Sequence, residues 1–180
     1  MTEAESYIDI EGSFSRFFKM SQNEGRVRQK EKVEFDYDEM VARYEKEKVE
    51  PFSPRHTVNV RLTDKVQDPL SAIYYVRLMD LCVGESARMV VHTCRRKWLL
   101  GVRVLKKEKV VLPKLGEFTA IKIQPEAAFP GVFVRKGRMT AWLEEKSRVP
   151  LKMTVDIPIG SVTVLLTEAR NSALVVPGKE

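Results

Sequence analysis

The segment from Val66 to Gly84 constrains the fold most, because it is the one convincing helix in a chain whose other segments are typical of strands. Asp68 can cap the first turn, and Pro69 suits the first helical position, where a missing N–H costs nothing. Four residues recur at helical spacing, namely Leu70, Ile73, Tyr74 and Arg77. The apolar residues Met79 and Leu81 extend this stripe. Gly84 closes the segment. One capped helix among strands predicts a mainly β architecture.

Alternation of apolar and polar residues predicts strands in the rest of the chain. Within residues 26–37 the apolar side chains share one parity, at Val27, Val33, Phe35 and Tyr37. This pattern is typical of a strand with one face exposed to solvent. The other predicted strands are 41–50 (a solvated strand or an exposed connection), 56–62, 86–93, 97–105, 106–112, 117–124, 138–143, 151–157 and 161–167, with turns or loops at 94–97, 113–116 and 125–131. We expect a curved antiparallel sheet, a half-barrel or open barrel, with one helix packed in its concave face.

Length and charge set the wider limits. The 180 residues are expected to form a single domain, 1–180. No apolar run approaches the roughly 20 residues of a membrane-spanning helix, and no signal peptide is visible at the start. Residues 1–90 hold 14 Lys and Arg against 17 Asp and Glu, whereas residues 91–180 hold 17 against 8. The basic second half favours either an anionic partner or a solvated lysine-rich face.

Catalytic signatures are absent from the sequence, which has no Gly-rich phosphate loop and no HExxH, CxxC or GxSxG motif. Cys82 and Cys94 are compatible with one disulfide, but their places at the ends of apolar segments favour buried free thiols. His56 and His92 match no zinc-ligand spacing, so structural or surface roles are expected. The carboxylate pairs are expected to be solvated charge: Asp36 with Asp38, and Glu144 with Glu145. No catalytic residue, metal or cofactor is predicted.

A basic cluster beside Trp98 is a candidate anion-binding patch. Its members are Arg95, Arg96, Lys97, Arg103 and Lys107. Basic side chains next to an aromatic residue can hold a phosphate or an anionic headgroup. Alternation sends Trp98 to the same face as Leu100 and Val102, so it is expected to anchor the core rather than stack on bases. Nucleic-acid binding is therefore not expected.

The concave face of the predicted sheet is the candidate ligand site. Its residues are Met89, Val91, Trp98, Leu100, Val102, Ile121, Met139 and Met153, with Tyr74 from the helix. If the helix covers the whole face, these side chains form the core. Where the face stays uncovered, it becomes an apolar groove suited to an acyl chain, and methionines help such a groove adapt.

Four segments of the chain suggest a family. They are FDYD (35–38), DPLSAIYYVR (68–77), LGEFTAIKI (115–123) and MTAWLEEKSRVPLKMTVDIPIGSVTVLL (139–166). Together they resemble the bacterial envelope family known as domain of unknown function 3108 (DUF3108), over residues 7–166. The resemblance implies an exported protein of the periplasm or cell envelope and supplies no catalytic residues. It also implies a signal peptide and further strands before residue 7, so the chain is expected to be an N-terminally incomplete copy.

These observations predict a non-enzymatic envelope protein that binds a lipid-like or other amphipathic ligand in the concave sheet. The alternative is a structural or assembly protein that binds an envelope protein partner at a sheet edge, since an unpaired edge is a site for association. A hydrolase with an unrecognised site is a third class. The sequence predicts neither the identity of a ligand nor the oligomeric state.

Overall fold

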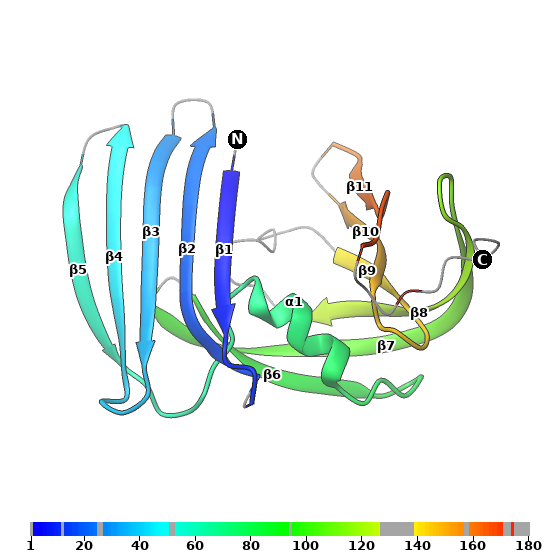
Figure 1. Ribbon diagram of the computed structural model, residues 1–180, viewed down its shortest axis with the longest axis horizontal. Helices are drawn as coiled ribbons and strands as arrows, with labels where there is room; N and C mark the ends of the chain where they lie inside the picture. Colours follow the sequence, from blue (N-terminus) through cyan, green and yellow to red (C-terminus); the bar gives the residue numbers. More distant parts are fainter. Residues whose placement is uncertain are drawn as a thin grey trace. The chain divides into compact units, whose positions relative to one another are not determined.

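The computed structural model describes residues 2–11, 13–24, 27–50, 53–93, 95–126, 139–156, 159–170 and 174. Its elements are β1 (Thr2–Ile8), β2 (Ser15–Glu24), β3 (Val27–Asp36), β4 (Val41–Glu50), β5 (Ser53–Arg61), α1 (Ser71–Tyr75), a 3₁₀ turn (Val76–Leu78), β6 (Ser86–Thr93), β7 (Arg96–Leu112), β8 (Gly116–Glu126), β9 (Met139–Glu144), β10 (Pro150–Asp156) and β11 (Ser161–Leu165). The strands form two antiparallel sheets, in the orders β1-β2-β3-β4-β5 and β11-β10-β9-β8-β7-β6 (Figure 1). The prediction of a mainly β protein with a curved, open antiparallel sheet and one helix is confirmed, although the strands form two sheets instead of the single sheet expected.

The chain divides into two compact units, which are described in turn. One consists of residues 1–75 and 89–98, and the other of residues 76–88 and 99–180. The prediction of a single domain stays a prediction. Among the described residues, no helix has the length and the apolar character needed to cross a membrane.

The core of the first unit lies on one face of the β1–β5 sheet. Phe18 pairs with Val33, and Val33 with Tyr44, so the three buried side chains form a row across β2, β3 and β4. The buried residues of this core are Phe18, Val33, Phe35, Ala42, Tyr44, Leu62 and Val66. The opposite face carries charged side chains, among them Lys19 and Glu5, whose Nζ and Oε2 atoms are 2.9 Å apart. The predicted one-sided strand at residues 26–37 is confirmed as β3.

The helix begins where the sequence predicts. Asp68 Oδ1 accepts the backbone N–H groups of Leu70 at 2.7 Å and Ser71 at 2.9 Å, and the Ser71 hydroxyl accepts the Asp68 N–H at 2.8 Å. This reciprocal arrangement satisfies donors that the first helical turn leaves unpaired. The predicted N-cap role of Asp68 is confirmed.

The buried face of the helix differs from the predicted stripe. Ala72 and Val76 are buried, whereas Tyr74 is exposed. α1 has only five residues before it becomes a 3₁₀ turn. A 3₁₀ turn has 3.0 residues per turn instead of 3.6, so the spacing read from the sequence is not kept.

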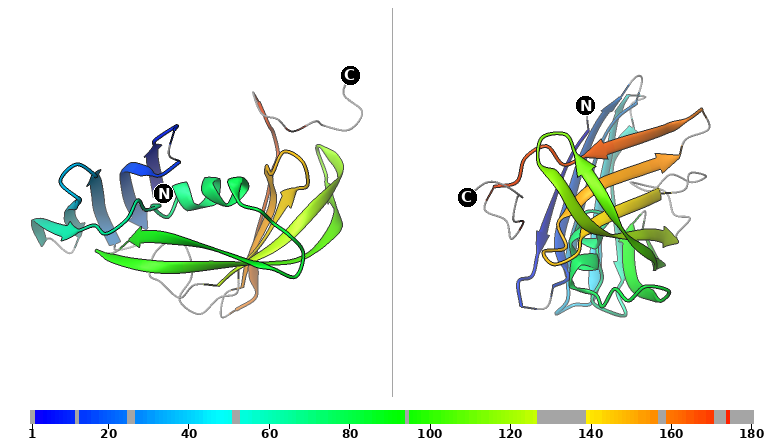
Figure 2. Two further views of the ribbon diagram at one scale, coloured as in Figure 1. Left: turned by 90° about the horizontal axis from the view of Figure 1, so that it is seen from below. Right: turned by 90° about the vertical axis from the view of Figure 1, so that its right-hand side faces the viewer.

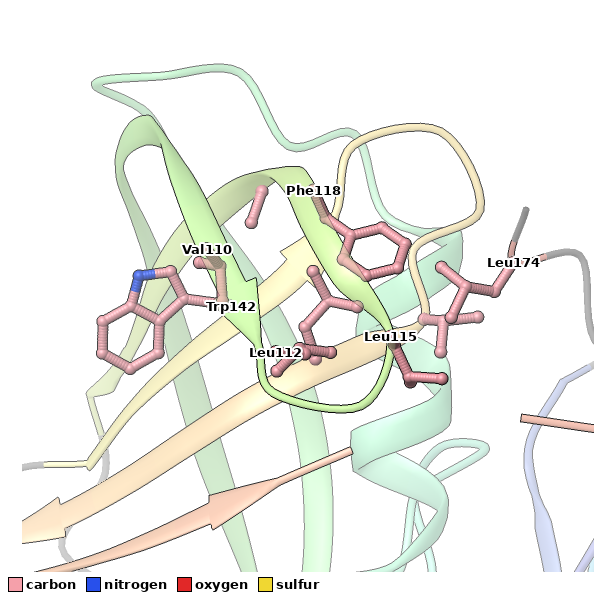
Figure 3. Close-up of a cluster of buried hydrophobic side chains, with 9 residues drawn as sticks. Val110, Leu112, Leu115, Phe118, Trp142 and Leu174 are labelled. Atoms are coloured by element: carbon pink, nitrogen blue, oxygen red, sulfur yellow. The ribbon is translucent and has the colours of Figure 1, made fainter. Parts of the chain in front are cut away.

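The second unit is built around a long, curved hairpin of β7 and β8 (Figure 2). The sequence predicted two strands at residues 97–112, but β7 runs unbroken, and a bulge between Val104 and Lys106 lies where the two strands were expected to meet. One buried cluster of this unit consists of Val110, Leu112, Leu115, Phe118, Ala120, Trp142, Val149, Leu151 and Leu174. In Figure 3, Trp142 and Leu174 lie at opposite ends of this cluster.

Several local predictions were wrong. β1 and β2 were not predicted, because the neighbouring aromatic residues Phe17 and Phe18 interrupt the alternation of β2. β4 was expected to be solvated, but Ala42 is buried, since it pairs with core residue Phe35. Cys82 is a free thiol that is exposed rather than buried, because the helix ends before it. Cys94 and residues 127–131 of the predicted loop lie outside the described residues.

Candidate functional site

The last three strands of the second sheet lie side by side, with β11 outermost (Figure 2). Their register places four side chains in one row across β8 to β11. Lys122 pairs with Trp142, Trp142 with Lys152, and Lys152 with Leu165. Directly paired residues of an antiparallel sheet project from the same face. We call Lys122, Trp142 and Lys152 the lysine–tryptophan row.

Trp142 holds this row in place. Its side chain belongs to the buried cluster of the second unit, which fixes the indole against the sheet. Lys122 Nζ lies 4.9 Å and Lys152 Nζ 4.7 Å from the centre of the ring, one lysine from each neighbouring strand. An ammonium group over an indole face is attracted by the electron density of the ring, and this attraction increases as water is excluded.

Glu108 on β7 supplies the negative charge of this site. Its Oε1 accepts the Trp142 indole N–H at 2.6 Å and lies 3.5 Å from Lys122 Nζ, while Oε2 lies 2.6 Å from Lys106 Nζ. The hydrogen bond from Lys106, followed by that from Trp142, lowers the pKa of Glu108 to about 2. Within the described part of the chain, Lys152 forms no ion pair. Three ammonium groups, those of Lys106, Lys122 and Lys152, therefore surround one carboxylate, and of the three only Lys152 has no ion pair in the described part of the chain.

A cavity connects the row to the outermost strand. It has a volume of about 410 Å³ and is lined by Trp142, Lys152 and Glu108 together with Thr163 and Leu165 of β11. The remaining lining residues are Lys109, Val110, Val111 and Pro113 of β7 and the following turn. An extended segment beside β11 would therefore have access to the ammonium group of Lys152.

Among the described strands, β11 ends the second sheet, and its five residues are all exposed. The Leu166 N–H donates to the Leu151 carbonyl oxygen at 2.8 Å. Because hydrogen-bonded pairs alternate along an antiparallel ladder, Val162 and Val164 bond to β10. The N–H and C=O groups of Ser161, Thr163 and Leu165 therefore point away from the sheet. The 3.2 Å separation of the Thr154 and Thr163 hydroxyl oxygens agrees with this register, because side chains approach most closely at non-hydrogen-bonded pairs.

β11 differs in charge from β1, β5 and β6, which are the other edge strands of the two sheets. β1 carries Glu3 and Glu5, β5 carries Arg55 and Arg61, and β6 carries Arg88. β11 has the sequence SVTVL and no charged residue. Charged side chains on edge strands oppose pairing with another chain. β11 lacks this protection.

The comparisons with known proteins identify the family. The family model described as "Protein of unknown function (DUF3108)" matches residues 1–167. The chain belongs to this family. No curated protein and no solved structure matches the chain. The family assignment covers all the strands of both sheets and confirms the resemblance seen in the sequence.

The structure of this DUF3108 chain distributes the predicted ligand residues over both units. Met89, Val91, Leu100, Val102, Ile121 and Met139 are buried, Trp98 and Met153 are half-buried, and Tyr74 is exposed. The Trp98 indole N–H donates to the Thr93 carbonyl oxygen at 3.2 Å. Most of these side chains thus serve as core in the structure, and their role in ligand binding stays a prediction.

The predicted basic patch is largely paired with carboxylates. Lys97 Nζ lies 3.0 Å from Asp64 Oδ2, Arg103 pairs with Glu126, and Lys107 Nζ lies 2.6 Å from Glu145 Oε1. Arg95 and Arg96 are exposed. Arg95 lines a second cavity, of about 380 Å³, in the first unit, together with Glu31, Tyr44, Lys46, Lys48, His56 and Val58.

The two histidines have different surroundings. His92 is 3% exposed, and its Nδ1 is hydrogen-bonded to the Tyr44 hydroxyl. Burial, and to a smaller extent Lys97, lowers the pKa of His92 to about 4. His56 is exposed. Among the described residues, no three His, Cys, Asp or Glu side chains are grouped so that they could hold a metal ion.

The carboxylate pairs were expected to be solvated charge, but one carboxylate of each pair accepts backbone hydrogen bonds. Asp36 accepts the backbone N–H of Glu39 and pairs with Arg43 at 2.8 Å, and both contacts, in that order of size, lower the pKa of Asp36. Glu144 accepts the backbone N–H groups of Lys146 and Ser147 in the turn after β9. These carboxylates stabilise turns.

The lysine–tryptophan row was not predicted from the sequence. A signal for it was present, because Ile121 was expected on the concave face, which sends Lys122 to the other face of the sheet. The same alternation sends Trp142 and Lys152 outward in their own strands. The three residues become neighbours through the register of β8, β9 and β10, and the periodicity of each strand alone does not predict this register.

Proposed function

We propose that this DUF3108 protein is a non-enzymatic binding protein that accepts an extended segment of a partner as an additional strand beside β11. The observation that carries the proposal is the uncharged, fully exposed edge, whose backbone groups at Ser161, Thr163 and Leu165 point away from β10. Such strand addition takes its affinity from main-chain hydrogen bonds and its specificity from alternate side chains. Location in the cell envelope, which the family resemblance implied, is part of this proposal.

Backbone geometry makes Thr163 the position for the test. Its N–H points away from β10, so a proline there removes a donor that only an added strand would use. Proline is tolerated in edge strands where the N–H faces solvent. Thr163→Lys is a second variant, since a lysine on an edge opposes pairing without altering the backbone.

The experiment is site-specific photocrosslinking in the source cells, with a photoreactive amino acid at Ser161. We expect a discrete protein adduct at Ser161, which disappears in Thr163→Pro and in Thr163→Lys. Leu99 is the control position, because it is exposed on β7 and does not line the cavity beside β11. If no adduct forms at Ser161, or if the adduct persists in both variants, the proposal is wrong.

A second candidate function is the binding of an amphipathic ligand in the 380 Å³ cavity of the first unit. Arg95, Lys46 and Lys48 supply positive charge around it, and Tyr44 and Val58 supply apolar lining. This combination suits an anionic headgroup with a short apolar portion. Lipid mass spectrometry on protein purified without detergent tests it: a lipid retained by the native chain and lost in Arg95→Glu would support this function, and a protein without lipid would refute it.

A further inference from the structure

The lysine–tryptophan row faces the same side of the sheet as the outward side chains of β11. Lys152 pairs with Leu165 and Thr154 with Thr163, so these four side chains lie on one face. Thr163, Leu165, Lys152 and Trp142 also line one cavity. An added strand beside β11 would send alternate side chains to this face, at the mouth of the cavity.

The charge of the cavity selects among the side chains that could enter it. Glu108 is engaged by Lys106, Lys122 and the indole of Trp142. Lys152 is half-buried over the indole and, in the described part of the chain, has no carboxylate within ion-pair distance. A partly desolvated ammonium group without a counter-charge is stabilised by an incoming anion, and like charges are rejected.

We infer that the partner segment accepted by β11 is acidic and that Lys152, held over Trp142, recognises one of its carboxylates. The inference rests on the proposed strand addition at β11 and names the chemistry of the partner. Lys122 contributes to the field of the site but shares Glu108, so Lys152 is the residue that decides the preference. In the competing explanation, the lysines only cover the faces of the indole with their methylene groups.

The test uses two fluorescein-labelled peptides and the full chain, with fluorescence polarisation as the readout. In the first peptide valine alternates with glutamate, and in the second glutamine replaces every glutamate. We expect the acidic peptide to bind about tenfold more tightly, which corresponds to about 1.4 kcal/mol. Lys152→Met, which keeps the length and packing of the side chain, is expected to abolish this difference. Lys114→Met removes the same charge from an exposed turn residue and is expected to leave it unchanged.

The outcomes separate this inference from the proposed function. If both peptides bind equally and Thr163→Pro abolishes both, strand addition stands and the acidic preference is wrong. If neither peptide binds the native chain, both proposals fail. A last experiment measures the binding of the chain to vesicles that contain phosphatidylglycerol. Vesicle binding that is lost in Lys152→Met but kept in Thr163→Pro would overturn the inference in favour of a lipid headgroup.

Discussion

Replacing Asp68 by alanine is expected to lower the free energy of unfolding of the first unit by about 2–4 kcal/mol. Asp68 is fully buried, and its carboxyl group accepts four hydrogen bonds. Oδ1 accepts the N–H groups of Leu70 and Ser71, and Oδ2 accepts the hydroxyls of Ser6 at 2.5 Å and Ser15 at 2.6 Å. Loss of a helix N-cap costs about 1 kcal/mol, and buried donors left without partners add about 1–3 kcal/mol.

Asp68 has this large effect because it joins three parts of the first unit. Ser6 belongs to β1, Ser15 begins β2, Leu70 directly precedes the helix, and Ser71 begins it. The Ser15 N–H also donates to the Val66 carbonyl oxygen, and Tyr37 donates its hydroxyl to the Ser15 carbonyl oxygen at 2.8 Å. Burial is the largest cause that raises the pKa of Tyr37 to about 12, so this hydroxyl remains a donor at neutral pH.

Native-state hydrogen exchange measures the expected loss, because it reports each region of the chain separately. The amide protons of Ser15 and His92 are suitable probes, since both are hydrogen-bonded within the first unit. Asp68→Asn is expected to lose about half as much stability, because its amide oxygen can still cap the helix while the hydroxyls rotate to accept. Asp38→Ala, at an exposed position of the turn after β3, is the control. Equal protection in Asp68→Ala and Asp38→Ala would contradict the prediction.

Local chemistry predicted the elements of the fold that depend on neighbouring residues. The helix start at Asp68 was visible because capping acts within three residues. β3 was visible because Val33 and Phe35 alternate with charged residues over a strand that is buried on one side only. The family match covers these segments and describes no site.

The features of the fold that were not predicted from the sequence depend on pairing between residues that are far apart in the chain. Gln67 forms an isolated parallel bridge with Val91, and its N–H donates to the Val90 carbonyl oxygen at 2.9 Å. No local pattern specifies that partner. The division of the strands into two sheets and the position of β11 at an edge depend on the same kind of choice. The lysine–tryptophan row depends on the same long-range pairing, because its three residues come from different strands. Predicting the row requires the order of these strands in the sheet.

Lowering the pH from 7.5 to 5 is expected to destabilise the first unit by about 2 kcal/mol through His92 alone. Its pKa is about 4 in the folded protein, mainly because of burial, and about 6.5 in an unfolded chain. The neutral imidazole is hydrogen-bonded through Nδ1 to the Tyr44 hydroxyl. Between pH 6.5 and 4 the unfolded chain therefore binds a proton that the folded chain excludes, so stability falls as the pH falls through this range. Above pH 6.5 both states are neutral and His92 contributes no pH dependence.

Urea unfolding followed by the fluorescence of Trp98 measures this effect, in a Trp142→Phe background so that the only indole belongs to the first unit. His92→Gln keeps an acceptor for Tyr44 but cannot titrate, so the fall in stability between pH 7.5 and 5 should shrink by about 2 kcal/mol. His56→Gln removes the exposed histidine and should leave the fall unchanged. A pH dependence that is the same in the native chain and in His92→Gln would show that His92 is not held neutral by its burial beside Tyr44.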